Sequence, residues 1–374
     1  MRLCIVSVNP MSFTFRANVL LLVCLLAHSS ALGQSSQPNP AQIEAQLKRA
    51  VEEAPEKFAP NHNLGEFYLQ QNNLSAAIPY LLKAQQLDPA HYANSYDLAL
   101  AYLLLGKTTE ARVQIRQTLA MAKTAELYQL LGEVEEKAGA VQSAAAAYYQ
   151  AAQIEASEKN LLSLGNLLIK SSNYAEAIKF LDYGLAQYPR SAQLKIALGI
   201  AKYSQGRYSE AVKTLCDAVD LEPGDERPYL FLGEMAGVST EMTGEIVKRM
   251  AQFVKYHPKN AMAYYYYAIN LRWQQENRVN DDERIEALLK TAVNLDPKLS
   301  QAHFELGTYY ADRQEYAAAI QAFRTAIAIN PGFEKAHYRL ARAYQQTGQT
   351  ALAIEEMGIF QRLKEDSSSR GTRP

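Results

Sequence analysis

The chain has 374 residues, and its 38 Lys and Arg against 39 Asp and Glu leave a formal net charge of −1. That length exceeds the roughly 250–300 residues at which a single hydrophobic core stops growing, so the chain must form several domains or an open-ended array. The near-balance of charge excludes a global basic field of the kind that binds nucleic acid or an acidic lipid surface.

Residues 1–33 have the composition of a secretory signal peptide. Arg2 and Arg16 precede an unbroken run of nine apolar residues, 19–27, and no acidic residue occurs in this segment. Nine apolar residues are too few to cross a bilayer, which takes about 20, so we expect no stable membrane span after cleavage. The small residues of "ALG" place cleavage before Gln34. We therefore expect an exported protein, in a periplasm or outside the cell.

Three alternatives to simple cleavage stay open. A permanent membrane anchor is the weaker interpretation for so short an apolar run. Cys24 permits a lipoprotein interpretation, although bulky Val23 precedes it and the apolar run continues after it. The long N-terminal segment also makes Met11 a possible initiator. Cleavage before Gln34 would leave Cys216 as the one cysteine, which excludes an intramolecular disulfide.

The rest of the chain divides into four segments by composition. Residues 34–40, "QSSQPNP", are polar and contain proline, as a linker does. Residues 41–57 predict an N-terminal capping helix, and from residue 58 to residue 365 apolar residues recur at intervals of three and four, which predicts helices throughout. Residues 366–374, "DSSSRGTRP", have the composition of a disordered tail.

Small residues recur at one register along the predicted helices. Nine of them mark nine successive units: Gly65, Ala99, Gly132, Gly165, Gly199, Gly233, Ala268, Gly307 and Ala341. The unit that contains residues 305–331 adds apolar and proline residues at further fixed offsets: Leu306, Tyr310, Ala319, Phe323, Ala326 and Pro331. Gly within a helix costs about 0.5–1 kcal/mol against Ala, so its recurrence indicates close helix crossings.

This pattern resembles the tetratricopeptide repeat, a 34-residue helix-turn-helix unit with small residues at positions 8, 20 and 27 and Pro at position 32. The resemblance implies an all-α fold, a right-handed α-solenoid of about nine repeats over residues 58–365, with a concave side. Two units depart from the pattern. Position 20 is lost after Gly233, and the segment after Ala268 carries five extra residues. That insertion, residues 273–284, is either a tolerated loop or a hinge or partner contact.

The sequence contains no motif that carries catalysis. It has no P-loop, no HExxH, no GxSxG and no CxxC, so we expect a protein that is not an enzyme and has no cofactor or metal. His303 and His337 are 34 residues apart at position 4 of successive units. A metal site would need further ligands in tight geometry, so packing is the favoured role of both histidines.

If the chain has a site, the resemblance places it on the concave surface formed by the first helix of each unit. Position 5, which faces that surface in the family, is aromatic in the last three units, as Tyr265, Phe304 and Tyr338. Large aromatic and Arg side chains are common in binding hot spots, and we expect these rings to point away from the seam between helices. Tyr is also a common packing residue in such repeats. The predicted partner-binding residues are Tyr265, Arg272, Trp273, Phe304, Lys335, Tyr338 and Arg342.

The carboxylate clamp of some family members is matched only in part. Lys335 and Arg339 occupy the last two of its five places, and the other three places carry different residues. The resemblance as a whole favours a non-catalytic protein–protein interaction scaffold of the cell envelope or periplasm, which binds protein or peptide partners. The alternative is an accessory subunit that binds a glycan or substrate for an envelope enzyme or a polysaccharide export system.

Overall fold

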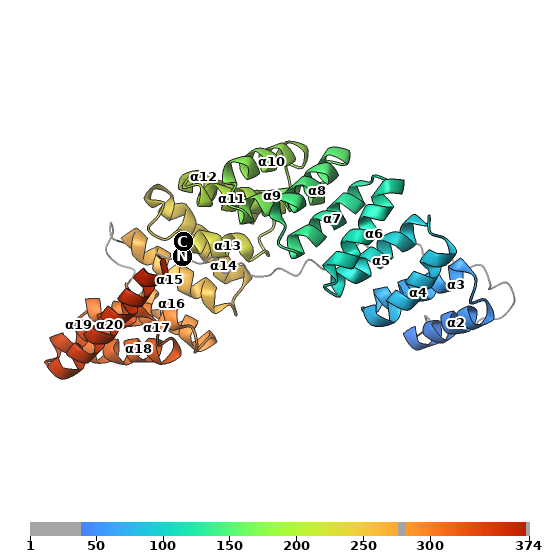
Figure 1. Cartoon of the computed structure of the whole chain (residues 1–374). Helices are drawn as coiled ribbons and strands as arrows, with labels where there is room; N and C mark the ends of the chain where they lie inside the picture. The colour runs from blue at the N-terminus through green and yellow to red at the C-terminus, as the bar shows by residue number, and fades with distance from the viewer. Residues whose placement is uncertain (1–38, 276–281, 372–374) are drawn as a thin grey trace, which may run out of the picture.

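The computed structural model describes residues 39–275 and 282–371. Over these ranges the chain is a single array of α-helices without β-strands, and each helix packs on its neighbours along the chain. Figure 1 shows the array as an arch with α2 near one end and α19 and α20 at the other. The predicted all-α array of paired helices is confirmed.

The helices alternate between the first and the second helix of a unit. The odd-numbered, first helices are α3 (Phe58–Gln70), α5 (Tyr92–Leu104), α7 (Ala125–Lys137), α9 (Glu158–Lys170), α11 (Ala192–Ser204), α13 (Arg227–Glu234), α15 (Ala261–Gln275), α17 (Ser300–Asp312) and α19 (Glu334–Gln346). The even-numbered, second helices are α4 (Leu74–Leu87), α6 (Thr108–Met121), α8 (Val141–Ile154), α10 (Tyr174–Gln187), α12 (Tyr208–Leu221), α14 (Thr243–Tyr256), α16 (Asp282–Leu295), α18 (Tyr316–Ile329) and α20 (Thr350–Gly371). The cap, α2 (Pro40–Glu53), precedes them.

The small residue of each regular unit lies where its two helices cross. A Cβ added to Gly65 would lie 2.7 Å from side-chain atoms of Leu81, and one added to Gly307 would lie 2.7 Å from the Phe323 ring. Leu81 and Phe323 are fully buried. Since real Cβ atoms do not approach other heavy atoms so closely, only a residue without a side chain allows this helix separation.

The side chain at position 4 caps the preceding turn in several units. Tyr229 donates a hydrogen bond to the carbonyl of Pro223 at 3.1 Å, six residues upstream. His337 Nε2 lies 3.0 Å from the Pro331 carbonyl oxygen, and its Nδ1 lies 2.6 Å from a Glu356 carboxylate oxygen. Both nitrogens of this buried ring are thus engaged by protein groups. The packing role predicted for His337 is confirmed.

The unit of Gly233 is irregular, as its sequence indicates. Its first helix, α13, has only 8 residues, and the 3-10 helix η1 (Thr240–Met242) leads into α14. The atoms nearest to a Cβ added at Gly233 belong to the Tyr266 ring of the next unit, at 2.3–2.7 Å. The buried Asn270 donates hydrogen bonds to the carbonyls of Gly233 at 3.0 Å and Tyr266 at 2.9 Å. Side chains of α15 therefore replace the contacts that the short helix lacks.

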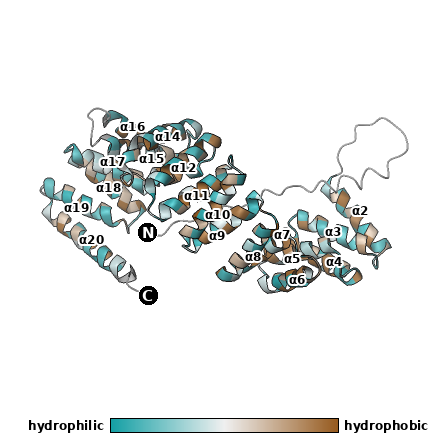
Figure 2. Ribbon diagram, turned by 90° about the horizontal axis from the view of Figure 1, so that it is seen from above, coloured by the Kyte–Doolittle hydropathy of each residue, from teal (hydrophilic) through white to brown (hydrophobic). Residues whose placement is uncertain are grey.

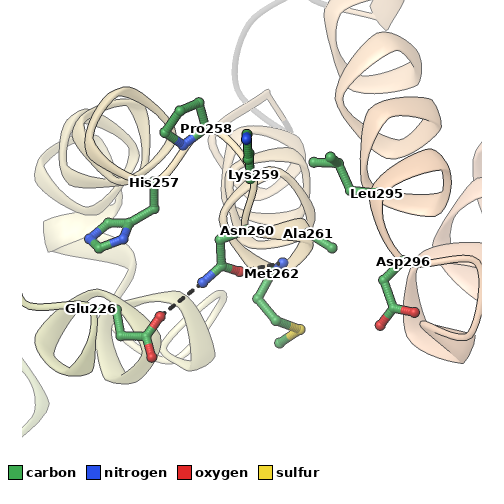
Figure 3. Close-up of a pocket in the computed structure, with 9 residues that line it drawn as sticks. All are labelled: Glu226, His257, Pro258, Lys259, Asn260, Ala261, Met262, Leu295 and Asp296. Carbon is green, nitrogen blue, oxygen red and sulfur yellow. Dashed lines mark hydrogen bonds between the residues drawn. The ribbon is translucent and has the colours of Figure 1, made fainter.

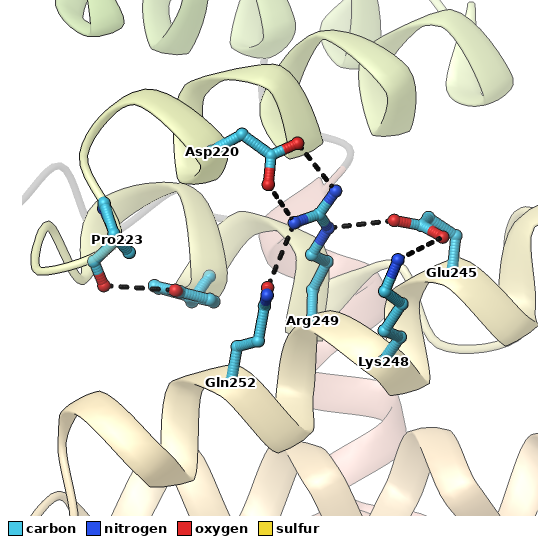
Figure 4. Close-up of polar contacts among 7 residues, drawn as sticks. Asp220, Pro223, Glu245, Lys248, Arg249 and Gln252 are labelled. Carbon is cyan, nitrogen blue, oxygen red and sulfur yellow. Dashed lines mark hydrogen bonds and ion pairs between the residues drawn. The ribbon is translucent and has the colours of Figure 1, made fainter.

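A buried cation ties this irregular unit to the one before it. The guanidinium of Arg249, on α14, donates to both carboxylate oxygens of Asp220 on α12, and to Glu245 at 2.9 Å and Gln252 at 3.0 Å (Figure 4). A buried charge is tolerated only when its hydrogen bonds are satisfied, and these partners satisfy it. Burial also raises the pKa of the nearby Cys216 thiol to about 11, so the thiol is protonated at neutral pH.

The two ends of the array differ from expectation in detail. Asn39 caps α2 with a capping box to Gln42, so the last two residues of the expected linker belong to the cap helix. At the other end α20 continues to Gly371, so the expectation of disorder from residue 366 is wrong for residues 366–371. The hydroxyls of Ser367 and Ser368 both donate hydrogen bonds to the Lys364 carbonyl oxygen, so these two polar side chains have a partner within the helix itself.

Several expectations fall outside the described residues. The expected signal peptide, 1–33, and most of the linker lie outside them, as do residues 276–281 of the insertion and residues 372–374 of the tail. Among the described helices, none combines the length and the apolar character that crossing a membrane requires.

Candidate partner-binding surface

The first helices form one side of the array, here named the first-helix surface. In the middle of the arch α9, α11 and α13 lie below α10 and α12, on the inner side of the curve (Figure 1). Residues at corresponding positions of successive first helices therefore lie along one continuous strip. All seven residues of the predicted site belong to three of these helices, α15, α17 and α19.

Two of the three predicted aromatic contacts are partly built into the core. The Phe304 ring lies 4.9 Å from the Phe333 ring and 5.8 Å from the buried Phe323 ring. The Tyr265 ring lies 5.2 Å from that of Tyr266, and burial raises the pKa of its hydroxyl. The expectation that all three rings stand clear of the helix seam is wrong for these two, because neighbouring rings draw them into hydrophobic clusters.

The exposed rings of the site are Tyr338 and Trp273. Tyr338 is 38% exposed and lies 5.3 Å from the Phe360 ring of α20. Trp273 is 46% exposed, and its indole lies against Gly237, where an added Cβ would come within 2.8 Å of the ring. Gly237 also has a φ of +73°, a left-handed conformation that favours glycine. The turn after α13 therefore supports one face of Trp273 and leaves the rest open to a ligand.

The cations of the site differ in how far they are already neutralised. Arg272 forms ion pairs with Glu305, at 3.0 Å, and with Asp312. Burial raises the pKa of the Glu305 carboxyl, while Arg272 opposes that shift. Lys335 and Arg342, on α19, are exposed and form no ion pair with any described residue. Arg272 thus holds α15 to α17, whereas Lys335 and Arg342 are available to an external anion.

Carboxylates, rather than cations, gather on the first-helix surface at α7. Burial together with the nearby carboxylates of Glu133 and Glu126 raises the pKa of Tyr96 to about 12. Glu126 and Glu133 lie on α7. Gln129 of that helix is buried and donates hydrogen bonds to Glu133 at 3.1 Å and to Ser163 at 2.9 Å. The surface therefore carries carboxylates at α7 and exposed cations at α19, so a bound peptide would meet different charges along its length.

Sequence reasoning missed a cavity at the edge of the array. It has a volume of about 630 Å³ and lies at the turns between units (Figure 3). Its lining residues are Glu226, His257, Pro258, Lys259, Asn260, Ala261, Met262, Leu295 and Asp296. Asn260 donates to Glu226 at 3.0 Å and caps Met262 through its side-chain oxygen. Repeat positions do not predict this cavity, because its lining comes from three successive turns, those that precede α13, α15 and α17.

Comparison with known families agrees with the architecture. Models of the tetratricopeptide repeat match residues 60–91, 96–160 and 168–234, and a model of the TPR repeat matches residues 307–348. Together they cover most of the units found in the structure. Their gap between residues 235 and 306 includes the irregular turn after α13 and the insertion after α15.

One curated relative is a tetratricopeptide repeat and J domain-containing co-chaperone, DNJ1, of Fusarium oxysporum f. sp. lycopersici. It is 24% identical over 219 residues, which cover 55% of this chain and 40% of the relative. The chain therefore spans less than half the length of that protein.

Among solved structures, the C-terminal part of a TPR repeat-containing protein from Cytophaga hutchinsonii is similar over 75% of this chain and 99% of that chain. Its TM-score is 0.53 and its identity 16%, a likeness of fold. YrrB, described as a TPR protein with an unusual peptide-binding site, is similar over 49% of this chain and 95% of its own, with a TM-score of 0.41 and 21% identity. With its repeated helix pairs and the family models that match them, the chain is a tetratricopeptide repeat protein.

Proposed function

We propose that this protein is an exported, non-catalytic scaffold that binds a peptide segment of a protein partner on the first-helix surface of its last three units. The observation that carries the proposal is the composition of α19. Its exposed face presents an aromatic ring, Tyr338, between Lys335 and Arg342, neither of which forms an ion pair with a described residue. Aromatic and Arg side chains that are already ordered on a rigid helix supply binding energy at low entropic cost.

The geometry favours an extended or helical segment that carries acidic and apolar side chains. Lys335 and Arg342 lie two helical turns apart with Tyr338 between them, so a peptide could meet both charges and the ring together. Exposed Trp273, on α15, offers a second apolar contact on the same surface. Tyr265 and Phe304 support the surface from beneath rather than form it.

Export is part of the proposal and is supported by the sequence of residues 1–33. One feature of the described fold is compatible with an oxidising compartment: Cys216 is buried, so it does not offer a free thiol at the surface. We propose that the exported protein acts within the cell envelope.

The test is comparative capture from an extract of the source cells. The full chain, the double variant Lys335→Glu/Arg342→Glu and the control Tyr183→Ala are immobilised equally, and retained molecules are quantified by mass spectrometry. Tyr183 is 55% exposed on α10, a second helix, so its loss tests nonspecific capture by an exposed ring. We expect a protein that the wild type and the control retain and the double variant loses. Retention of a glycan without a protein, or equal retention by all three, contradicts the proposal.

A further inference from the structure

The last helix, α20, has one side that no described helix covers. Its other side faces α19, since Glu356 lies 2.6 Å from His337 and the Phe360 ring lies 5.3 Å from that of Tyr338. Helical periodicity places Gly358 on the opposite side, and a Cβ added there would meet no atom within 4 Å. Figure 2 shows α20 at the outer edge of the array, beyond α19.

Gly358 differs from the glycines at the helix crossings of the regular units. Gly65, Gly199 and Gly307 each lie against a side chain that an added Cβ would approach within 2.7 Å. The close packing that each of these glycines permits offsets the cost of about 0.5–1 kcal/mol that Gly imposes within a helix. Gly358 also lies within a helix but has no such contact with any residue that the structure describes. A helix that crosses α20 at this point, from outside the chain, would account for it.

An exposed apolar side chain lies beside Gly358. Ile354, one turn earlier on the same side, is 69% exposed, more than any other large hydrophobic residue of the described ranges. Val212 and Ile178 hold the corresponding position in earlier units, where the following unit buries them. The uncovered side of α20 is therefore suited to a further helix.

The charges on this side indicate which helix that is. Glu355 lies three residues before Gly358 and Arg362 four residues after it, and both are exposed. Neither forms an ion pair within the part of the chain that the structure describes. When two α20 helices cross antiparallel at Gly358, each Glu355 faces Arg362 of the other copy. The surface is thus complementary to itself under a twofold axis, as an isologous interface requires.

We propose that a second copy of this chain covers the open side of α20, in an antiparallel helix pair centred on Gly358. The backbones approach closely there because neither copy has a side chain at the crossing. Ile354 packs on Gln361 and on the aliphatic part of Arg362 of the second copy. The pairing uses the side of α20 that faces away from α19, so it is independent of the proposed partner-binding surface.

Charge reversal tests this pairing. The masses of the full chain, Glu355→Arg, Arg362→Glu and the double variant are measured by sedimentation equilibrium up to about 100 μM, well above a micromolar Kd. We expect a wild-type dimer, at least ~5-fold weaker association for each single variant, and recovery in the double variant, whose charges again face opposite charges. A monomeric wild type, unaffected single variants, or a double variant that does not recover overturns the proposal.

Cross-linking gives a second, geometric test. In the full chain with Cys4→Ser and Cys24→Ser, the remaining Cys216 is buried and should not react. Adding Gly358→Cys places one thiol of each copy beside the twofold axis. The pairing should bring the two residue-358 Cα atoms within the separation of about 4.4–6.8 Å that a disulfide needs. We expect a covalent dimer on mild oxidation. Ile154→Cys, which alters a residue 49% exposed on α8, is the matched control and should stay monomeric on a denaturing gel. Equal cross-linking at both positions contradicts the pairing.

Discussion

Gly307 and Phe323 lie so close that a Cβ on residue 307 would come within 2.7 Å of the ring. The helices α17 and α18 cross at this point, and Phe323 is fully buried there. Replacing Gly307 with Leu should destabilise the fold by about 1–3 kcal/mol, because a bulky side chain must push the helices apart. The urea midpoint of unfolding measures this change.

Gly224→Leu is the control for Gly307→Leu. Gly224 lies in a turn where an added Cβ would meet no atom within 4 Å, so the same substitution should leave the midpoint nearly unchanged. Equal midpoints for the two variants would show that the crossing is not at residue 307.

Phe304 should matter for stability more than for recognition. Its ring packs on Phe323 and Phe333, so Phe304→Ala should lower the free energy of unfolding by about 2–4 kcal/mol, somewhat less than for a fully buried ring. Tyr338→Ala, at the same position of the next unit, should lower it by less than about 1 kcal/mol because that ring is more exposed. Urea unfolding of both variants decides the point. A more damaging Tyr338→Ala would show that the two rings have the opposite roles.

The repeat register could be predicted from sequence because it depends on local sterics. A small residue such as Gly307 marks a helix crossing whatever the neighbouring units contain, and Pro331 marks the end of α18 for a similarly local reason. The same register could not separate Phe304 from Tyr338. Their different exposure depends on the rings that lie next to each: Phe323 and Phe333 lie beside Phe304, whereas Phe360 lies beside Tyr338.

The structure of the irregular unit of Gly233 could likewise be predicted only in part from the sequence. The loss of position 20 after Gly233 was visible in the sequence, but its structural consequence depends on contacts with the next unit. Asn270 and Tyr266 supply those contacts from α15, and the turn at Gly237 then supports Trp273. Such contacts between units vary with each side chain, so neither this site nor the cavity beside Asn260 follows from the repeat pattern.

Stability should fall on mild acidification because of His62. Burial lowers the pKa of this imidazole, whose Nδ1 donates a hydrogen bond to the side-chain oxygen of Asn94 at 3.2 Å and whose ring lies near Phe58 and His91. A base whose pKa is lower in the folded than in the unfolded state contributes stability above the unfolded pKa, about 6.5, and loses it as the pH falls through the folded value.

The check is the urea midpoint between pH 7.5 and pH 5 for wild type and His62→Phe. The variant keeps an aromatic ring of similar size but cannot titrate, so its midpoint should fall less over this interval. Parallel curves for the two proteins would show that His62 does not contribute to the pH dependence.

Export predicts a specific N-terminus. The apolar run at 19–27 and the small residues before Gln34 lead us to expect that the mature protein begins at Gln34. N-terminal sequencing of protein purified from its native cells reads this directly. Cytosolic protein that retains residue 1 would contradict export, and a membrane-bound form with residues 1–33 intact would support the anchor instead.

The central claim is that a protein partner binds on the first-helix surface of the last units. Its most direct test is the Kd of the partner retained by capture, measured by isothermal titration with wild type, Tyr338→Ala and Tyr183→Ala. Loss of a hot-spot ring should cost about 1–2 kcal/mol of binding free energy, so we predict a Kd roughly 5–30-fold higher for Tyr338→Ala, with at most a small shift of its melting curve. Tyr183→Ala should change neither quantity. If Tyr338→Ala binds the partner as tightly as wild type, or binds weakly only because it unfolds, the claim is contradicted.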